Sequence, residues 1–119
     1  MACILVIDDD DAVRKTVSRI LMRSHHVAIE ADNGRSGLRR LVEDRPGIMI
    51  TDIVMPEQEG IETILEARRL VPGIKIIAMS GGDNGLYLKA AAKLGADAVL
   101  AKPFRPAELT SLVERLLTA

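Results

Sequence analysis

Short apolar runs alternate with segments of helical periodicity from one end of the chain to the other. The runs have strand length and cover residues 3–7, 27–31, 48–51, 74–79 and 98–101. After most of them, apolar residues recur three or four positions apart, as on one face of a helix. These residues are Val13, Val17, Ile20 and Leu21, then Leu38, Leu41 and Val42, then Ile61, Ile64 and Leu65, and finally Leu109, Leu112, Val113, Leu116 and Leu117. With a further helix over residues 86–94, the pattern predicts five strands, each followed by a helix. We expect the sets that end in Val42 and Leu117 to face the core.

Turn and cap residues mark where the helices begin and end. Asn33 is suited to open the second helix, and Pro46-Gly47 stops it. Pro72-Gly73 ends the third helix and Gly95 closes the fourth. Pro106 suits the first turn of the last helix.

Strands that alternate with helices predict a parallel sheet with helices packed on both of its faces. The first, third and fourth runs are almost entirely apolar, as expected of central strands buried on both sides. The second run contains Glu30, which favours a position at the edge of the sheet. We therefore expect one α/β domain that occupies residues 1–119.

Polar side chains follow four of the five runs, at the end of a parallel sheet where sites form. Asp8 and Asp9 follow the first run, Asp52 the third, Ser80 the fourth and Lys102 the fifth. Carboxylates that lie close together repel one another unless a cation offsets their charge, and oxygen ligands select Mg²⁺ or Ca²⁺. A carboxylate nucleophile beside an ammonium and a hydroxyl group indicates phosphoryl transfer through an aspartyl phosphate.

Each of these features has a plainer explanation when it is taken alone. Acidic residues before a helix more often stabilise its N-terminus, and we expect that role for Asp10 and Asp11. We expect surface or cap roles for His25 and His26, and solvated helix faces for the basic residues of the first forty positions. The coincidence of polar groups at four strand ends nevertheless favours the phosphoryl-transfer interpretation.

Composition limits the classes of function. A net charge of −1 and an aromatic content of 2% argue against direct binding of nucleic acid. Cys3 is the single cysteine, which excludes an internal disulfide and favours a reducing compartment. Because the chain shows neither signal-peptide features nor an apolar run long enough to span a bilayer, we expect a cytoplasmic protein without membrane attachment.

Four segments resemble the receiver domains of bacterial response regulators. Residues 4–10 (Ile-Leu-Val-Ile-Asp-Asp-Asp) are similar to the first strand and acidic pair of that family, and residues 50–56 with Gly60 to its phosphorylation segment. Residues 76–81 are similar to the strand with the switch hydroxyl, and residues 95–104 to the last strand with its Lys-Pro. The resemblance implies a flavodoxin-like, doubly wound sheet of order 2-1-3-4-5, an order for which a member of this same family is a standard example.

The resemblance also implies a chemical role for the acidic residues. Asp52 would accept a phosphoryl group from a phosphohistidine on a sensor histidine kinase or a histidine phosphotransfer protein. Mg²⁺ would be bound by Asp9, by Asp8 chiefly through water, by Asp52 and by the backbone carbonyl of Val54. A domain of this kind is not a conventional enzyme, although it assists its own phosphoryl transfer and dephosphorylation.

A conformational switch is implied by the same resemblance. Lys102 would pair with the phosphoryl oxygens, the Ser80 hydroxyl would move toward them, and the Lys102–Pro103 bond would be cis. An output partner would meet the surface formed by the fourth helix, fifth strand and fifth helix. Val99 occupies a position where the family usually has Tyr or Phe, so the usual rotation of an aromatic ring is not possible here.

The lifetime of the phosphate depends on two positions near Asp52 and Ser80. In relatives, polar side chains two residues beyond each of them can orient the attacking water. Here these positions hold Val54 and Gly82, which predicts slow self-dephosphorylation.

Two alternative functions remain open at this point. A phosphohydrolase of the haloacid dehalogenase type would use the spacing of Asp8 and Asp10, but Ala12 stands where that motif has Thr or Val. A receiver-like interaction module that works without phosphorylation is the other alternative, and Val99 is the residue that favours it.

Overall fold

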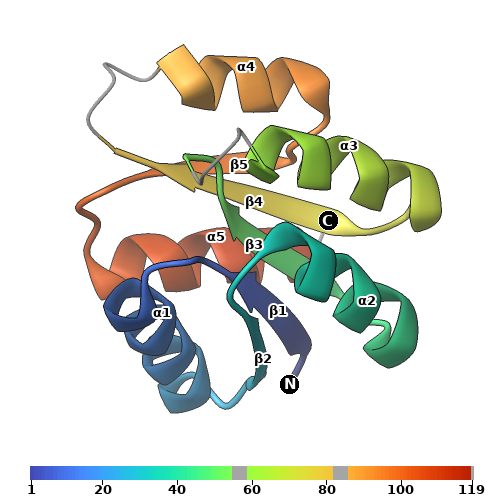
Figure 1. Ribbon diagram of the computed structural model, residues 1–119. Helices are drawn as coiled ribbons and strands as arrows, with labels where there is room; N and C mark the ends of the chain where they lie inside the picture. The colour runs from blue at the N-terminus through green and yellow to red at the C-terminus, as the bar shows by residue number, and fades with distance from the viewer. Residues whose placement is uncertain (55–58, 82–85, 119) are drawn as a thin grey trace.

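The computed structural model describes residues 1–54, 59–81 and 86–118, and within them five strands alternate with five helices (Figure 1). The elements are β1 (Cys3–Ile7), α1 (Asp11–Arg23), β2 (Val27–Ala31), α2 (Gly34–Asp44), β3 (Ile48–Asp52), α3 (Glu59–Leu70), β4 (Lys75–Ser80), α4 (Leu86–Leu94), β5 (Ala98–Ala101) and α5 (Pro106–Thr118). The predicted alternation is confirmed. Asp52 and Ser80 are the last residues of their strands, whereas we expected them to follow the strands.

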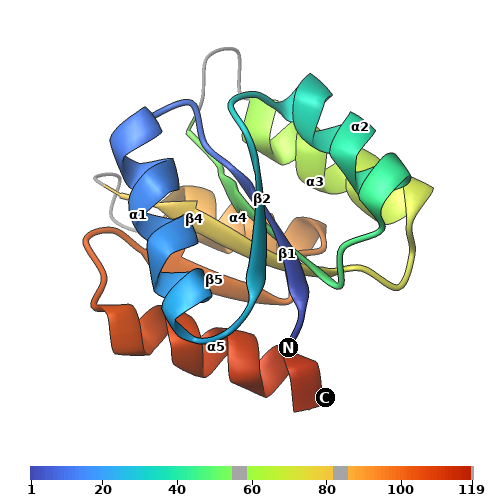
Figure 2. The same ribbon diagram turned by 90° about the horizontal axis from the view of Figure 1, so that it is seen from below.

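The strands form one parallel sheet in the order β2-β1-β3-β4-β5, as predicted. Helices α1 and α5 cover one face of the sheet, and α2, α3 and α4 cover the other (Figures 1 and 2). β2, which carries Glu30, lies at an edge, while β1, β3 and β4 are central. Because all the strands are parallel, their carboxyl ends lie at one rim of the sheet, and the reversal of winding between β1 and β3 leaves a crevice at that rim.

Two hydrophobic cores hold the layers together. Alternate residues of a strand point to opposite faces, so Ile4 and Val6 pack with the residues of α1 and α5, whereas Leu5 and Ile7 pack beneath α2, α3 and α4. All four of these side chains are fully buried. The central strands are apolar on both faces because both faces are covered.

Two residues that we expected to face the core are exposed. Val42 is 45% exposed and Leu117 is 40% exposed. Each follows a buried leucine, Leu41 or Leu116, and a helix turns by about 100° per residue. That rotation carries the second residue of each pair to the margin of the buried face.

The helix caps agree with the sequence pattern. The Asp10 carboxylate accepts hydrogen bonds from the backbone N–H groups of Ala12 and Val13, so it caps α1 as predicted. The Asn33 side chain caps α2 by accepting from the N–H of Ser36. Among the described residues, no helix combines the length and apolar character needed to cross a bilayer.

His25 and His26 lie in the C-terminal cap of α1, as expected, because their N–H groups donate to the carbonyls of Met22 and Leu21, but the His26 side chain is buried and not at the surface. Only 7% of the residue is exposed, its Nδ1 accepts a hydrogen bond of 3.0 Å from the Ala2 N–H, and its Nε2 lies 3.2 Å from Oε1 of Glu114. The imidazole therefore joins the start of the chain to α5. Sequence spacing could not indicate this role, because both partners are distant from His26 along the chain.

Candidate functional site

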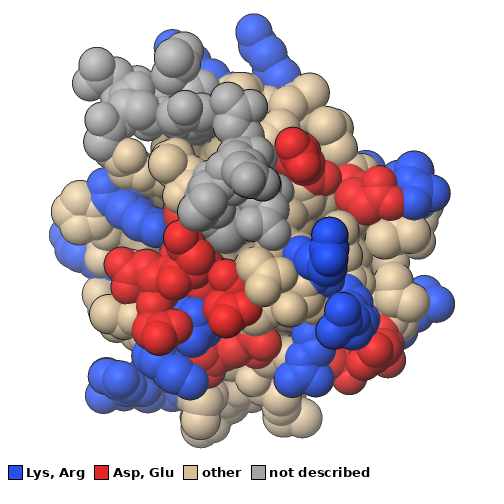
Figure 3. Space-filling model, in the orientation of Figure 1, with Lys and Arg blue, Asp and Glu red and all other residues tan. Residues whose placement is uncertain are grey.

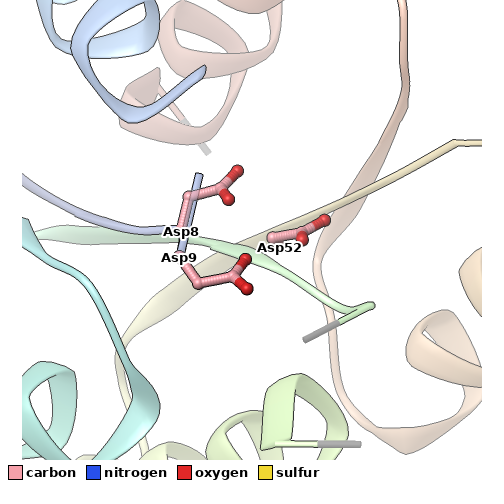
Figure 4. Close-up of side chains that lie close together, drawn as sticks. All are labelled: Asp8, Asp9 and Asp52. Carbon is pink, nitrogen blue, oxygen red and sulfur yellow. The ribbon is translucent and has the colours of Figure 1, made fainter. Parts of the chain in front are cut away.

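Three aspartates meet at the carboxyl ends of β1 and β3. The two strands pair in parallel with Ile7 opposite Thr51, so the residues that follow, Asp8 and Asp52, lie side by side. One carboxylate oxygen from each of Asp8, Asp9 and Asp52 lies within 4.8 Å of the other two. Figure 4 shows the three side chains close together, with their carboxylates pointing in a similar direction. The predicted convergence of these three residues is present in the structure.

Lys102, the residue that follows β5, also contacts this cluster. Its Nζ donates to Oδ2 of Asp8 at 3.2 Å and to Oδ1 of Asp52 at 3.1 Å. The Lys102 N–H donates to the Ser80 carbonyl at 2.7 Å, which continues the β4–β5 pairing to the position of the lysine. The Lys102–Pro103 bond is cis, as the family resemblance implied.

Asp8 and Asp9 differ in how firmly they are held. Asp8 is fully buried, and its Oδ1 accepts a hydrogen bond of 2.9 Å from the Asp10 N–H. With Lys102 on Oδ2, both carboxylate oxygens of Asp8 are engaged. Asp9 is exposed and is therefore the carboxylate of the pair that is more accessible to an ion from solvent.

Ser80 places a hydroxyl group at the end of β4. The residue is 1% exposed, and its Oγ has no hydrogen-bond partner in the described part of the chain. A buried hydroxyl without a partner costs about 1–3 kcal/mol, so native proteins rarely leave one unsatisfied without a functional reason. An oxyanion bound next to Asp52 would supply an acceptor.

The site is electrostatically unbalanced, with three carboxylates and one ammonium group. Burial raises the pKa of Asp52 above its ordinary value; Lys102 opposes this shift, and the charges of Asp8 and Asp9 add to it. For Lys102, burial lowers the pKa, but the attraction of Asp52 and Asp8 prevails and raises it above the ordinary value. The lysine is therefore charged at neutral pH.

The donor atoms fit a hard divalent cation. All three side chains offer carboxylate oxygens, which Mg²⁺ and Ca²⁺ prefer over the ligands of softer metals. Figure 3 shows a group of acidic side chains at the surface near the start of α1. The excess negative charge of the three carboxylates over Lys102 would be offset by two positive charges.

Three further positions that the sequence singled out are Val54, Val99 and Gly82. Val54 follows β3 and is 49% exposed. Val99 points outward from β5 with 39% of its surface exposed. Gly82 lies outside the residues that the structure describes.

Sequence reasoning missed Arg14, which was grouped with the solvated basic residues. Its side chain is only 11% exposed, and it donates to the backbone carbonyl of Asp8. A signal was present in the sequence: Arg14 stands three positions before Val17 and seven before Leu21, so it shares their inward face of α1.

Comparison with known proteins assigns a family to this arrangement. A family model described as the response regulator receiver domain matches residues 4–114. The chain is 32% identical to the chemotaxis protein CheY of Halobacterium salinarum over 116 residues, which are 98% of this chain and 97% of that protein. It is 33% identical to the response regulator receiver protein CpdR of Brucella abortus, with 100% of this chain and 99% of that protein covered.

Longer relatives contain a similar segment. The chain is 36% identical to the DNA-binding transcriptional regulator NtrC of Azospirillum brasilense over 99% of its own length, but it spans only 24% of that protein. Among solved structures, NtrX from Brucella abortus superposes with a TM-score of 0.93 at 28% identity, covering 98% of this chain and 27% of that one. CheY4 of Vibrio cholerae superposes with a TM-score of 0.87 at 26% identity, covering 98% of both chains.

Proposed function

The chain belongs to the response regulator receiver family, and from that membership we propose that it is a phospho-acceptor domain, occupying residues 1–119, with Asp52 as the acceptor. One observation carries the proposal: the Asp52 carboxylate contacts Lys102 and lies close enough to the carboxylates of Asp8 and Asp9 for all three to bind one metal ion. The donor would be a phosphohistidine on a sensor histidine kinase or a histidine phosphotransfer protein in the cytoplasm.

The geometry suggests how Asp52 attacks. Its Oδ1 accepts from Lys102, which leaves Oδ2 as the nucleophile. A bond forms between Oδ2 and phosphorus while the phosphorus–nitrogen bond breaks, and its electron pair returns to the donor imidazole. Asp8, Asp9, Asp52 and the Val54 carbonyl would hold Mg²⁺, which neutralises charge on the transferred group when it is bound.

Two groups are available to the product phosphate. The Lys102 ammonium can pair with one phosphoryl oxygen, and the Ser80 hydroxyl, which has no partner among the described residues, can donate to another. Movement of Ser80 toward the phosphate would shift the equilibrium between two arrangements of β4 and the segment after it toward the active one. In this proposal the energy of the switch comes from contacts that exist only after phosphorylation.

The output surface would be that of α4, β5 and α5. A shallow groove there is lined by Val99, Arg105, Glu108, Ser111 and Leu112, among others. Because Val99 carries no ring that could turn inward, we propose that the signal reaches this surface through backbone displacement along β4 and β5.

Incubation with acetyl phosphate and Mg²⁺, followed by intact-mass measurement, tests the function. One phosphoryl adduct is expected, which EDTA prevents and Asp52→Asn abolishes. Asp10→Asn is the matched control, because Asp10 caps α1 and makes no contact with Lys102 or Asp52 in the structure; this variant should be phosphorylated like the wild type.

Two other outcomes would point to the alternatives. No adduct on wild-type protein would favour an interaction module that works without phosphorylation. Turnover of a phosphate ester that depends on Asp8 and survives Asp52→Asn would favour a phosphohydrolase.

A further inference from the structure

Arg14 connects three separate segments at the back of the acidic site. Its Nη1 donates to the Asp8 carbonyl oxygen at 2.9 Å, its Nε to Oε1 of Glu30 at 3.0 Å, and its Nη2 to Oδ1 of Asp11 at 2.6 Å. These partners belong to the end of β1, to the edge strand β2 and to the first turn of α1. The guanidinium is largely buried and does not contact the Asp52 carboxylate in the structure.

The hydrogen bond from Arg14 to the Asp8 carbonyl restrains the peptide group that Asp8 shares with Asp9. A peptide group is planar, so the carbonyl of Asp8 and the N–H of Asp9 lie in one plane and turn together. The Asp8 N–H is already held by the Ala31 carbonyl at 3.2 Å, and its carboxylate by Asp10 and Lys102. Arg14 supplies the remaining restraint, which acts on the peptide that leads to Asp9.

We propose that Arg14 is a positioning residue that fixes the Asp8–Asp9 peptide, so that both carboxylates project toward Asp52 despite their mutual repulsion. The inference rests on the proposed function to the extent that this pair binds Mg²⁺. When a side chain that orients metal ligands without touching the metal is replaced, the affinity of the protein for the metal commonly falls about 10–100-fold.

Only arginine among the cationic side chains suits this position. Its planar fork offers five N–H donors and can serve three acceptors in different directions, whereas a lysine ammonium is a single point of charge. Glu30 also receives Lys15 Nζ at 3.1 Å, so replacement of Arg14 does not leave this carboxylate without a cation. Asp11 loses its contact with Arg14 as well, but its side chain is 82% exposed and stays hydrated. The consequence for the acidic site is loss of the restraint on the Asp8 carbonyl.

Arg68 provides a matched control within the same fold. It donates to the carbonyls of Pro72, Ile74 and Gly95 and pairs with Asp97 at 2.8 Å. These partners lie at the ends of the strands remote from the acidic cluster. Arg68→Met therefore removes a comparable set of arginine contacts and leaves the Asp8–Asp9 peptide untouched.

The experiment compares Arg14→Met, Arg14→Lys and Arg68→Met with the wild type. The Mg²⁺ dissociation constant is measured by titration calorimetry, and hydrogen exchange of the Asp10 amide, which donates to Asp8, is measured by NMR without metal. We expect Arg14→Met to weaken Mg²⁺ binding about tenfold or more and to speed this exchange. Arg14→Lys should fall between Arg14→Met and the wild type, and Arg68→Met should bind Mg²⁺ like the wild type although it is destabilised.

The outcomes separate the two proposals. Arg14→Met with unchanged affinity and unchanged Asp10 exchange overturns the positioning role, and so does an equal loss of affinity in Arg68→Met. If Arg14→Met does not fold, wild-type affinity in Arg14→Lys overturns the role instead. A wild-type protein that fails to bind Mg²⁺ overturns the proposed function, while the metal-free exchange still decides whether Arg14 holds the peptide.

Discussion

At the scale of single residues, the charge on Asp52 opposes folding while no metal is bound. Burial raises its pKa against the attraction of Lys102, and Asp8 and Asp9 raise it further. A carboxyl group with a raised pKa in the folded state holds its proton more tightly there. It therefore stabilises the fold at low pH, and this stabilisation is lost as the pH rises through that pKa.

Asp52→Asn should therefore be more stable than the wild type at neutral pH in EDTA. The difference should shrink as the pH falls through the pKa of Asp52, because the wild-type side chain then becomes neutral as well. Urea unfolding followed by circular dichroism across this range measures the effect. Asp97→Asn is the control, since it weakens the ion pair with Arg68 and should not stabilise the protein. A wild type that is more stable than Asp52→Asn at neutral pH would contradict the electrostatic account.

A second prediction at this scale concerns the lifetime of the phosphate. Val54 stands two residues after Asp52, is half-exposed, and has no polar atom in its side chain to orient a water molecule. Val54→Asn should therefore lose its phosphoryl group several-fold faster than the wild type. The decay of labelled phosphoprotein in Mg²⁺, with no phosphatase present, gives both rates. Val99→Asn, which introduces the same amide on β5, should decay like the wild type. Equal rates for wild type and Val54→Asn would show that water is positioned by other groups.

At the scale of elements, the approach of α3 to β3 depends on Gly60. A Cβ added at this position would overlap the Asp52 carbonyl oxygen and the Ile53 Cα, both of which are backbone atoms. Gly37 of α2 differs, because an added Cβ there overlaps the Cδ1 and Cγ1 atoms of Ile7, which belong to a side chain and not to the backbone.

Gly60→Ala should lower the free energy of unfolding by about 2 kcal/mol, since the backbone must move to relieve the overlap. Gly37→Ala should cost less than about 1 kcal/mol, because higher helix propensity offsets part of the strain. Chemical denaturation of both variants makes the comparison. If Gly37→Ala costs as much as Gly60→Ala, the closeness of α3 to the β3 backbone is not the cause.

At the scale of the whole molecule, the site connects segments that are far apart in sequence, so an ion bound there should stabilise the whole fold. A ligand present at about ten times its dissociation constant contributes about 1.4 kcal/mol to folding. For a domain of this length that corresponds to a rise of about 6 °C in Tm.

We therefore expect Mg²⁺ to raise the Tm of the wild type by this amount and EDTA to reverse the change. Asp9→Asn should lose most of the shift, because it removes the exposed carboxylate of the cluster, whereas Asp10→Asn should retain it. Calorimetric scans with and without Mg²⁺ give the comparison. A shift that persists in Asp9→Asn would place the ion at another site.

The main lines of the fold and site could be predicted from local sequence. Helical and strand periodicities predicted every element because each core-facing side chain must recur on one face. The strand-end positions of Asp8, Asp52, Ser80 and Lys102 followed from the same pattern, because parallel strands end at a common rim. The sequence pattern gave a wrong burial for residues at the margin of a helix's buried face, such as Val42, because one step along the helix separates them from a core residue.

The amino-acid sequence by itself therefore determined the order of the elements, the sheet they form and the chemical groups delivered to its rim. Only the tertiary structure decided which polar side chains become buried connectors. The sequence pattern gave no partners for Arg14 and His26, yet one holds the Asp8 carbonyl and the other joins Ala2 to Glu114. Burying such a group is tolerable only where partners meet it, and those partners come from segments that folding alone brings together.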